Sequence, residues 1–265
     1  MKIIHIISMN VEEEEKRNFF EIGINLKPGF CTFKIDEDDE RWPSIKELVN
    51  KYSFVDFTYT EFSRTEIEKA KYLAISASWH HGYPQPEDNF GFLEATYDLS
   101  QYCKTCGSGL IQKAPFRFKK APAWGKKSIL QANWIFDEYF VPPDVWERVF
   151  KPLGIECRPV LLHKDGLTIE TVVQLDVSHI VELQMNDIHN YYKCDACGIK
   201  KYPPISRGHT PSPRFDTNHH MFKSAQYFGS GGVARKIVLG SHELQQAISS
   251  AGIKGGKFLV CGDPN

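Results

Sequence analysis

The sequence lacks a long hydrophobic run. No stretch approaches the roughly 18 apolar residues that a membrane-spanning helix needs. The short apolar run within MKIIHIISMN is interrupted by His5 and followed by four consecutive glutamates at 12–15, which is not the pattern of a secretory signal peptide. We therefore expect a cytoplasmic protein with no membrane partner.

The sequence also has almost no net charge, −1 over 265 residues. A chain so close to neutral has no gross attraction to nucleic acid or membrane. The charges are nevertheless unevenly distributed, because residues 1–100 carry 11 basic and 19 acidic side chains whereas residues 101–265 carry 21 and 14. This split suggests either two halves that face each other or a basic half with an anionic partner.

No catalytic motif can be recognised. The chain shows no nucleophile elbow, no Ser-His-Asp order and no pair of carboxylates at an informative spacing. The glycine-rich stretch YFGSGGVARK at 227–236 lacks the Gly-Lys-Ser/Thr ending of a phosphate-binding loop and does not match Gly-x-Gly-x-x-Gly. We interpret this stretch as a flexible turn, and we expect that the protein is not an enzyme.

Two pairs of adjacent histidines, His80–His81 and His219–His220, are the other candidates for chemistry. Adjacent side chains point in different directions, so each pair offers at most one ligand to a common metal ion. No carboxylate or third histidine stands at a recognisable spacing. We interpret both pairs as polar loop residues.

Four of the seven cysteines form two copies of one motif. The segments CKTCG and CDACG are both Cys-x-x-Cys-Gly, and 87 residues separate Cys106 from Cys194. Two thiolates three positions apart can grip one metal ion, and glycine after the second cysteine suits the positive φ that such a knuckle often needs. In the cytoplasm such pairs are more often metal or redox sites than disulfides, and an odd cysteine count argues against a disulfide framework.

The economical interpretation is one structural Zn²⁺ per chain. Tetrahedral zinc takes four ligands, and each knuckle supplies two. The predicted ligands are Cys103, Cys106, Cys194 and Cys197. Lysines beside the motifs would offset the negative charge of such a site: Lys104, Lys193, Lys200 and Lys201. A redox dithiol and ordinary buried thiols remain alternatives, because the spacer is far longer than the roughly 15–20 residues of a compact zinc ribbon.

A basic tract follows the first knuckle and interleaves cations with aromatic residues. Its possible contacts to a partner are Lys113, Arg117, Lys119, Lys120, Trp124, Lys126 and Lys127. Such a composition can hold phosphates while stacking on bases. The alternation of Phe116 and Phe118 with Arg117 and Lys119 also fits a half-buried strand with a solvated outer face. A solvated strand, an anionic protein partner and nucleic acid all remain open.

The pattern of elements favours an α+β fold with mixed or antiparallel sheets, a few short helices and a zinc-ribbon-like four-cysteine site that joins distant segments. Helices are expected from Ser44, from Ser63 and over 241–252, and strands over 2–8, 72–78 and 128–136. A turn at Asp165-Gly166 predicts a hairpin. We expect an acidic α/β region at 1–100 and a zinc-stabilised basic α+β region at 101–265, unless the two form one continuous domain.

These residues resemble a known family, the bacterial double-CxxCG motif proteins. The hallmark is the pair of distant knuckles; the lead-in TYDLSQYCKTCG and the closing ELQQAISSAGIKGGKFLVC are also similar. The resemblance covers chiefly residues 90–265, and within it only the cysteine motifs are specific. Some members are regarded as immunity proteins against polymorphic toxins. The resemblance therefore implies zinc binding by the four cysteines and a toxin-like protein partner, whose surface the protein would mask.

The sequence thus predicts a non-catalytic, zinc-binding protein that binds another protein, with a bacterial toxin as the partner that the resemblance implies. One alternative is a zinc-ribbon-type nucleic-acid-binding protein that uses the tract at 113–127. Another is a dithiol oxidoreductase, for which the cysteine pairs would be the redox centres.

Overall fold

The computed structural model describes residues 1–186 and 189–262, and the chain divides into two compact units. The first unit comprises Met1–Glu66 with Ile205–His209, and the second comprises Ile67–Pro204 with Thr210–Asn265. The change in charge at residue 100 therefore falls within the second unit. Both knuckles and the whole basic tract also belong to the second unit.

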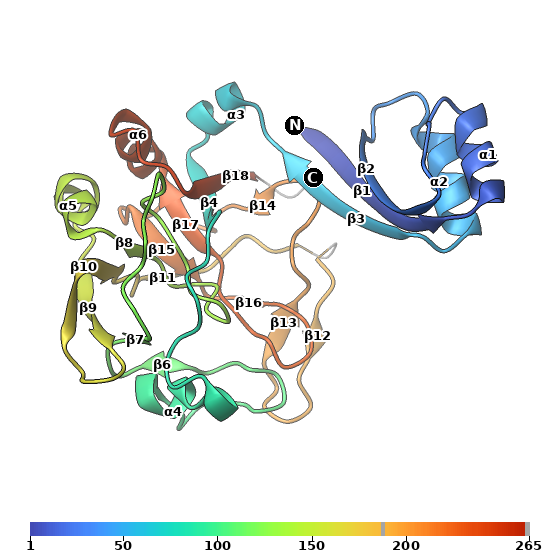
Figure 1. Ribbon diagram of the computed structural model, residues 1–265. Coiled ribbons are helices and arrows are strands. Elements are labelled where there is room, and N and C mark those ends of the chain that lie inside the picture. Colours follow the sequence, from blue (N-terminus) through green and yellow to red (C-terminus); the bar gives the residue numbers. More distant parts are fainter. Residues whose placement is uncertain (187–188, 263–265) are drawn as a thin grey trace. The chain divides into compact units, whose positions relative to one another are not determined.

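The first unit is a three-stranded antiparallel sheet with two helices packed on one face (Figure 1). Along the chain it runs β1 (Lys2–Val11), α1 (Glu13–Glu21), β2 (Gly29–Asp36), α2 (Trp42–Lys51) and β3 (Val55–Glu61), and the sheet order is β2-β1-β3. Alternate residues of β1, Ile7, Met9 and Val11, are buried with Phe19 and Ile45 of the helices. This alternation is what a sheet covered on one face requires.

One predicted helix start is wrong and another is confirmed. The helix α2 begins at Trp42, two residues before the predicted start at Ser44. The Trp42 ring stacks on His5 of β1 with 3.7 Å between ring centroids. At α3 (Arg64–Lys69) the capping box forms as expected. The Ser63 backbone N–H donates to the Glu66 carboxylate at 2.7 Å, and the Glu66 N–H donates to Ser63 Oγ at 3.2 Å.

The second unit is built on a six-stranded mixed sheet with the order β11-β15-β17-β4-β18-β14. Its strands are β4 (Tyr72–Ala77), β11 (Ile180–Val181), β14 (Thr210–Pro211), β15 (Met221–Ser224), β17 (Val238–Ser241) and β18 (Gly256–Gly262). The helix α6 (His242–Ser250) packs against this sheet through Leu244 and Ile248. Ser241 Oγ accepts a hydrogen bond from Leu244 N at 3.2 Å, so the predicted N-cap is confirmed.

A second sheet contains the predicted hairpin. Its order is β7-β9-β10-β8, with β7 (Arg117–Phe118), β8 (Phe140–Val141), β9 (Cys157–Leu162) and β10 (Thr168–Leu175). Asp165-Gly166 lies in the turn between β9 and β10, and Gly166 has φ 74°. Between β8 and β9 the chain makes three short helical turns, α5 (Pro143–Val145), η2 (Trp146–Phe150) and η3 (Lys151–Leu153).

The strand predicted over 128–136 does not form. This segment has only isolated bridges, at Leu130 to Phe140 and at Gln131 to His80. The Gln131 side chain takes over part of the hydrogen bonding of a ladder, because it accepts from Ala77 N at 3.1 Å and donates to the carbonyl of Phe136 at 2.6 Å. Ile129 and Leu130 are buried all the same. The apolar run therefore indicates that the segment is buried, but it does not indicate a strand.

Two small sheets complete the second unit. One pairs β5 (Tyr97–Asp98) with β6 (Ile111–Gln112), after the short helices η1 (Asp88–Phe90) and α4 (Phe92–Thr96). The other has the order β12-β13-β16, with β12 (Tyr192–Lys193), β13 (Lys200–Tyr202) and β16 (Tyr227–Phe228). The predicted α+β class, with mixed and antiparallel sheets and few short helices, is confirmed.

Candidate metal centre

The two knuckles are turns of the same kind. The first joins β5 to β6, the second joins β12 to β13, and both strand pairs are antiparallel. In each knuckle the glycine N–H donates to the carbonyl of the first cysteine at 2.7 Å. The N–H of that cysteine in turn donates to the carbonyl five residues later, from Cys103 to Ser108 at 2.8 Å and from Cys194 to Ile199 at 3.0 Å. The repeated sequence therefore encodes a repeated backbone, as in a zinc ribbon.

The glycine that follows each cysteine pair has a positive φ, 82° at Gly107 and 74° at Gly198, which L side chains rarely adopt. The two positions differ in the space around them. A Cβ at Gly107 would lie 2.2 Å from the carbonyl oxygen of Gly232, whereas at Gly198 it would meet only the flexible Lys193 side chain at 3.5 Å. Gly107 is therefore required by both conformation and packing, and Gly198 by conformation alone.

This difference gives a matched pair of variants. Gly198→Ala should lower the free energy of unfolding by about 1–2 kcal/mol, the cost of a left-handed alanine. Gly107→Ala should cost clearly more, since the backbone at Gly232 must also move. Urea denaturation of the two variants beside the wild type measures both values, and equal losses would contradict the close packing at Gly107.

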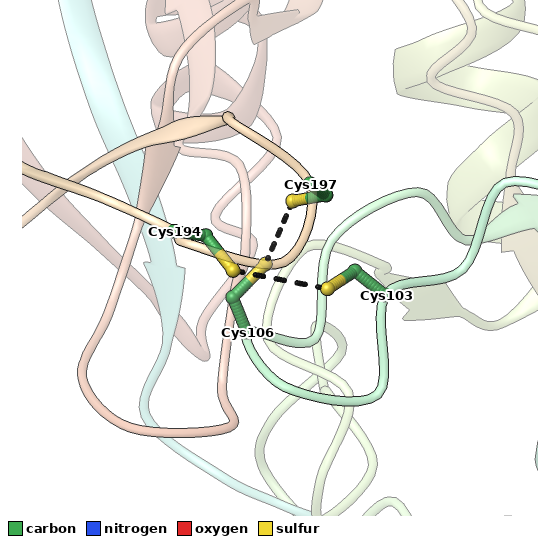
Figure 2. A group of neighbouring side chains, drawn as sticks. All are labelled: Cys103, Cys106, Cys194 and Cys197. Carbon is green, nitrogen blue, oxygen red and sulfur yellow. Dashed lines mark hydrogen bonds between the residues drawn. The ribbon is translucent and has the colours of Figure 1, made fainter.

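All four cysteines of the knuckles converge. Their Sγ atoms lie within 4.8 Å of one another, although 87 residues separate the two motifs. Figure 2 shows the side chains reaching inward from the two loops. Two of these approaches join one knuckle to the other, 3.6 Å from Cys106 to Cys197 and 3.9 Å from Cys103 to Cys194. The sulfur atoms are too far apart for a disulfide, whose bond length is about 2.05 Å.

The donor set can hold a single metal ion. A tetrahedral zinc with Zn–S bonds of about 2.3 Å has its sulfur atoms about 3.8 Å apart, which is close to both cross-knuckle distances. Four soft thiolates suit zinc or a similar thiophilic ion, and not magnesium or calcium. Because the four cysteines fill all four positions, an ion held here has no open position for water or substrate.

The thiol pKa values show why the cluster favours a cation. The backbone N–H groups of Cys106 and Thr105 overcome partial desolvation and lower the pKa of the Cys103 thiol to about 6. At Cys197 the backbone N–H of Ile199 also lowers the pKa of the thiol. Desolvation and the other three sulfur atoms outweigh it and raise this pKa to about 11. Four thiols this close cannot all ionise without a compensating charge, which a dication supplies.

Lys201 connects the metal cluster to its surroundings. Its side chain is only 1% exposed, and Nζ donates to three carbonyl oxygens, of Cys106 at 2.9 Å, Gly231 at 2.5 Å and Val233 at 2.9 Å. Burial lowers the pKa of this ammonium, while the thiols of Cys106 and Cys103 act in the opposite direction. The sequence predicted Lys201 as one of four charges near the site, but it did not predict that Lys201 is buried and hydrogen-bonded to three carbonyls.

Two further features of the site escaped sequence reasoning. The glycine-rich stretch 227–236, predicted as a flexible turn, supplies two of the three carbonyls that Lys201 binds and packs against Gly107. Ser108 is fully buried, with Oγ 3.1 Å from Cys106 Sγ. The sequence hinted at this packing only through the several glycines of 227–236, since glycine allows two backbone segments to approach closely.

The basic tract is a half-buried strand and loop. Phe116 and Phe118 have no exposed surface and belong to the core, as the strand interpretation predicts, so neither ring is available to stack on a base. The Trp124 indole N–H donates to the carbonyl of Thr171 at 2.9 Å. The charged residues of the tract are exposed or half-buried: Lys113, Arg117, Lys119, Lys120, Lys126 and Lys127. As partner contacts, these side chains and Trp124 stay a prediction.

The histidine pairs do not join a metal cluster. Within residues 1–186 and 189–262, the four cysteines are the one group of three or more potential ligands that lie close enough to share an ion. The ring nitrogen Nε2 of His81 lies 3.0 Å from the carbonyl of Lys120, and His219 stacks on His179 with 3.4 Å between ring centroids. His220 Nδ1 lies 2.9 Å from Ser241 Oγ.

Comparisons with known proteins add no identification. No model of a known protein family matches the chain, and no curated protein matches it. Within the part of the chain that the structure describes, no helix has both the length and the apolar character needed to cross a membrane.

Proposed function

We propose that this chain is a zinc-containing, non-catalytic protein of the cytoplasm whose role is to bind another protein. The observation that carries the proposal is the closed set of four thiolates. Zinc enzymes keep a coordination position for water or substrate, whereas a metal with four cysteine ligands holds the fold together. A protein with a structural metal then acts through its surfaces.

The partner that we infer is a bacterial toxin. The inference rests on the two distant Cys-x-x-Cys-Gly knuckles, which resemble those of the double-CxxCG motif proteins. An immunity protein neutralises a toxin by covering a surface that the toxin needs. Such a role requires a stable scaffold and an exposed contact face, and it requires no chemistry.

The first unit offers such a face on the side of its sheet that the helices leave open. In β1, Ile6 alternates with the buried Ile7, so it lies on the side away from the helices, and the strand register places Phe57 beside it. Phe30 and Val55 lie on the same side. These four apolar residues lie on the open face, which they share with polar residues of the same strands; Phe30 is 79%, Val55 65% and Phe57 58% exposed. Large exposed apolar side chains of this kind mark contact surfaces.

The charge of the first unit indicates the character of the partner. Residues 1–66 and 205–209 carry 14 acidic and 10 basic side chains. A protein with a basic surface would approach this unit faster and orient itself by charge before the apolar contact forms. We therefore expect a toxin with a basic face.

The test is to identify the proteins encoded next to this chain and to measure whether a toxin-like one among them binds it. We expect a one-to-one complex with a dissociation constant in the nanomolar range or below, measured by calorimetry. Phe57→Asp should weaken it at least a hundredfold, because a charge would be buried at the centre of the contact. Phe20→Asp, at an exposed position on α1, is the matched control and should have little effect.

Two results would count against the proposal. One is the absence of any complex with that protein. The other is turnover of a small substrate by the purified chain at a useful rate, which would make it an enzyme. Salt-dependent retention of DNA or RNA that vanishes in the double variant Lys119→Glu/Lys120→Glu would favour the nucleic-acid-binding alternative instead.

A further inference from the structure

Two adjoining cavities lie in the second unit beside the first knuckle. Their volumes are about 260 and 240 Å³. Both are lined by Tyr97, Gly107, Leu110, Asp137 and Ala234, so the two cavities meet at a shared wall. We name them the charged cavity and the aromatic cavity, after the residues that line the rest of each. Neither belongs to the four-thiolate cluster.

The charged cavity is built around a buried ion pair. Glu138 and Lys223 pair through Oε1 and Nζ, and their side chains are only 8% and 11% exposed. Gln174 Nε2 donates to the other oxygen of Glu138 at 3.0 Å. Burial opposes the charge on Lys223, but the carboxylates of Glu138 and Asp137 raise the pKa of its ammonium. A charged ammonium has three N–H donors, and Glu138 accounts for one of them.

Several polar groups of this cavity have hydrogen-bonding capacity to spare. Within the described residues the Tyr97 hydroxyl has no hydrogen-bond partner, although the residue is buried. This hydroxyl therefore keeps its proton and its lone pairs for a group that enters the cavity. The Tyr227 hydroxyl accepts from Gly109 N at 3.3 Å and has its proton left to donate. One oxygen of Asp137 accepts from Lys236 N at 3.3 Å, which leaves the other oxygen for a ligand.

The formal charges of the lining balance. Three carboxylates, Asp137, Glu138 and Asp176, face three cations, Arg158, Lys223 and Lys236. Arg158 pairs with Asp176 at 2.9 Å and Lys223 pairs with Glu138, so neither sign of charge is in excess in the lining. A ligand with one charge of each sign can pair with both sets.

The aromatic cavity has a different lining and an unusual backbone. Trp134 stands with its ring centroid 4.6 Å from that of Phe90 and 5.9 Å from that of Phe92. Phe90 and Trp134 have φ values of 55° and 67° and remain substantially exposed. Aromatic residues rarely adopt such backbone conformations, and residues that do so cluster at ligand sites. The rings thus form a preformed apolar wall.

We propose that the two cavities together bind a small zwitterion of the α-amino-acid class with an aromatic side chain. The carboxylate would accept hydrogen bonds from Lys223 and from the tyrosine hydroxyls. The ammonium would lie at Asp137, which lines both cavities, and the side chain would enter the aromatic cavity against Trp134. This arrangement matches the ligand, because in an α-amino acid the ammonium is attached to the carbon that bears the side chain.

The test is calorimetric titration of the zinc-loaded, full-length protein with phenylalanine, tyrosine and tryptophan. At least one should bind with a dissociation constant below one millimolar. Three partial analogues of phenylalanine should bind at least tenfold more weakly: 3-phenylpropionate lacks the ammonium, 2-phenylethylamine lacks the carboxylate, and glycine lacks the ring. Failure of all three aromatic amino acids to bind would overturn the proposal, and so would equally tight binding of either singly charged analogue.

A matched pair of variants separates ligand binding from folding. Tyr97→Phe removes a hydroxyl that bonds to no described residue, so the zinc content and the melting temperature should stay as in the wild type while ligand affinity falls about tenfold. Asp137→Asn should weaken binding by a similar factor. Tyr191→Phe changes an exposed tyrosine outside both cavities and should leave affinity unchanged. If Tyr97→Phe and Asp137→Asn bind the ligand as tightly as the wild type, the assignment fails.

Discussion

Replacing Cys194 by serine should reduce the zinc content from one ion per chain to nearly none. A serine hydroxyl is a poor ligand for zinc, and the Cys194 sulfur lies 3.9 Å from the Cys103 sulfur of the other knuckle. With three thiolates left, the ion loses both affinity and the link between the two loops. Metal analysis of the purified variant beside the wild type measures the effect directly.

The same substitution should destabilise the second unit. An ion that holds both knuckles closes a loop of 87 intervening residues, and by analogy with a disulfide of that length the link contributes about 4–5 kcal/mol. For a unit of this size the melting temperature should fall by about 10–15 °C. The core of the second unit is large enough that we expect a weakened fold and not an unfolded chain.

Cys157→Ser is the matched control for this experiment. Cys157 is a free cysteine in β9 of the second unit and is not part of the cluster, so its replacement should leave the zinc content at one per chain. Equal zinc in wild type and Cys194→Ser would refute a site shared between the knuckles. Rapid reaction of all four cluster thiols with a thiol reagent in the zinc-loaded protein would support the dithiol alternative instead.

The cysteine cluster was predictable because its chemistry is local. Cys-x-x-Cys-Gly fixes a turn, and the turn repeats with the same hydrogen bonds at 103–107 and 194–198. Each knuckle supplies two thiolates, so two knuckles that come together provide the four ligands of one tetrahedral ion. The predicted helix caps at Ser63 and Ser241 and the predicted turn at Asp165-Gly166 depend on local sequence in the same way, and all three are confirmed.

Features that depend on distant partners could not be predicted. The apolar run at 128–136 forms isolated bridges in place of a strand, and Gln131 bonds through its side chain to Ala77 N and to the carbonyl of Phe136. The first residue of α2, Trp42, contacts His5, which is far away in the sequence, and the sequence pattern around Ser44 carries no sign of this contact. The paired cavities are assembled from segments that carry no common motif, so their charge balance appears only in three dimensions.

Lys201 is the strongest case of a residue whose role depends on distant partners. In the sequence it is the second lysine of a Lys-Lys-Tyr run, which is typical of an exposed strand end. In the fold, Lys200 is exposed and stacks over Tyr191 with Nζ 4.3 Å from the ring centroid, whereas Lys201 is buried and has all three N–H groups bound to carbonyls. Strand alternation explains why neighbours have such different surroundings.

Lys201→Met should therefore cost about 3–5 kcal/mol of folding free energy. Methionine has a similar volume and length, so little packing is lost, but three buried carbonyl oxygens lose their donor at about 1–3 kcal/mol each before the loops relax. The carbonyls belong to Cys106 and to Gly231 and Val233 of the glycine-rich loop. That loop should separate from the first knuckle, and a chelator should remove the zinc faster than from the wild type.

Lys200→Met is the matched control, since it removes the same charge from the neighbouring residue. It should cost less than about 1 kcal/mol, the value of an exposed cation–π contact. Urea denaturation gives both free energies, and the rate of zinc loss to a chelator gives the second readout. Equal effects of the two variants would mean that Lys201 acts only through its charge near the thiolates. A large difference would mean that its three hydrogen bonds hold the first knuckle to the glycine-rich loop, so that the site depends on a lysine as well as on four cysteines.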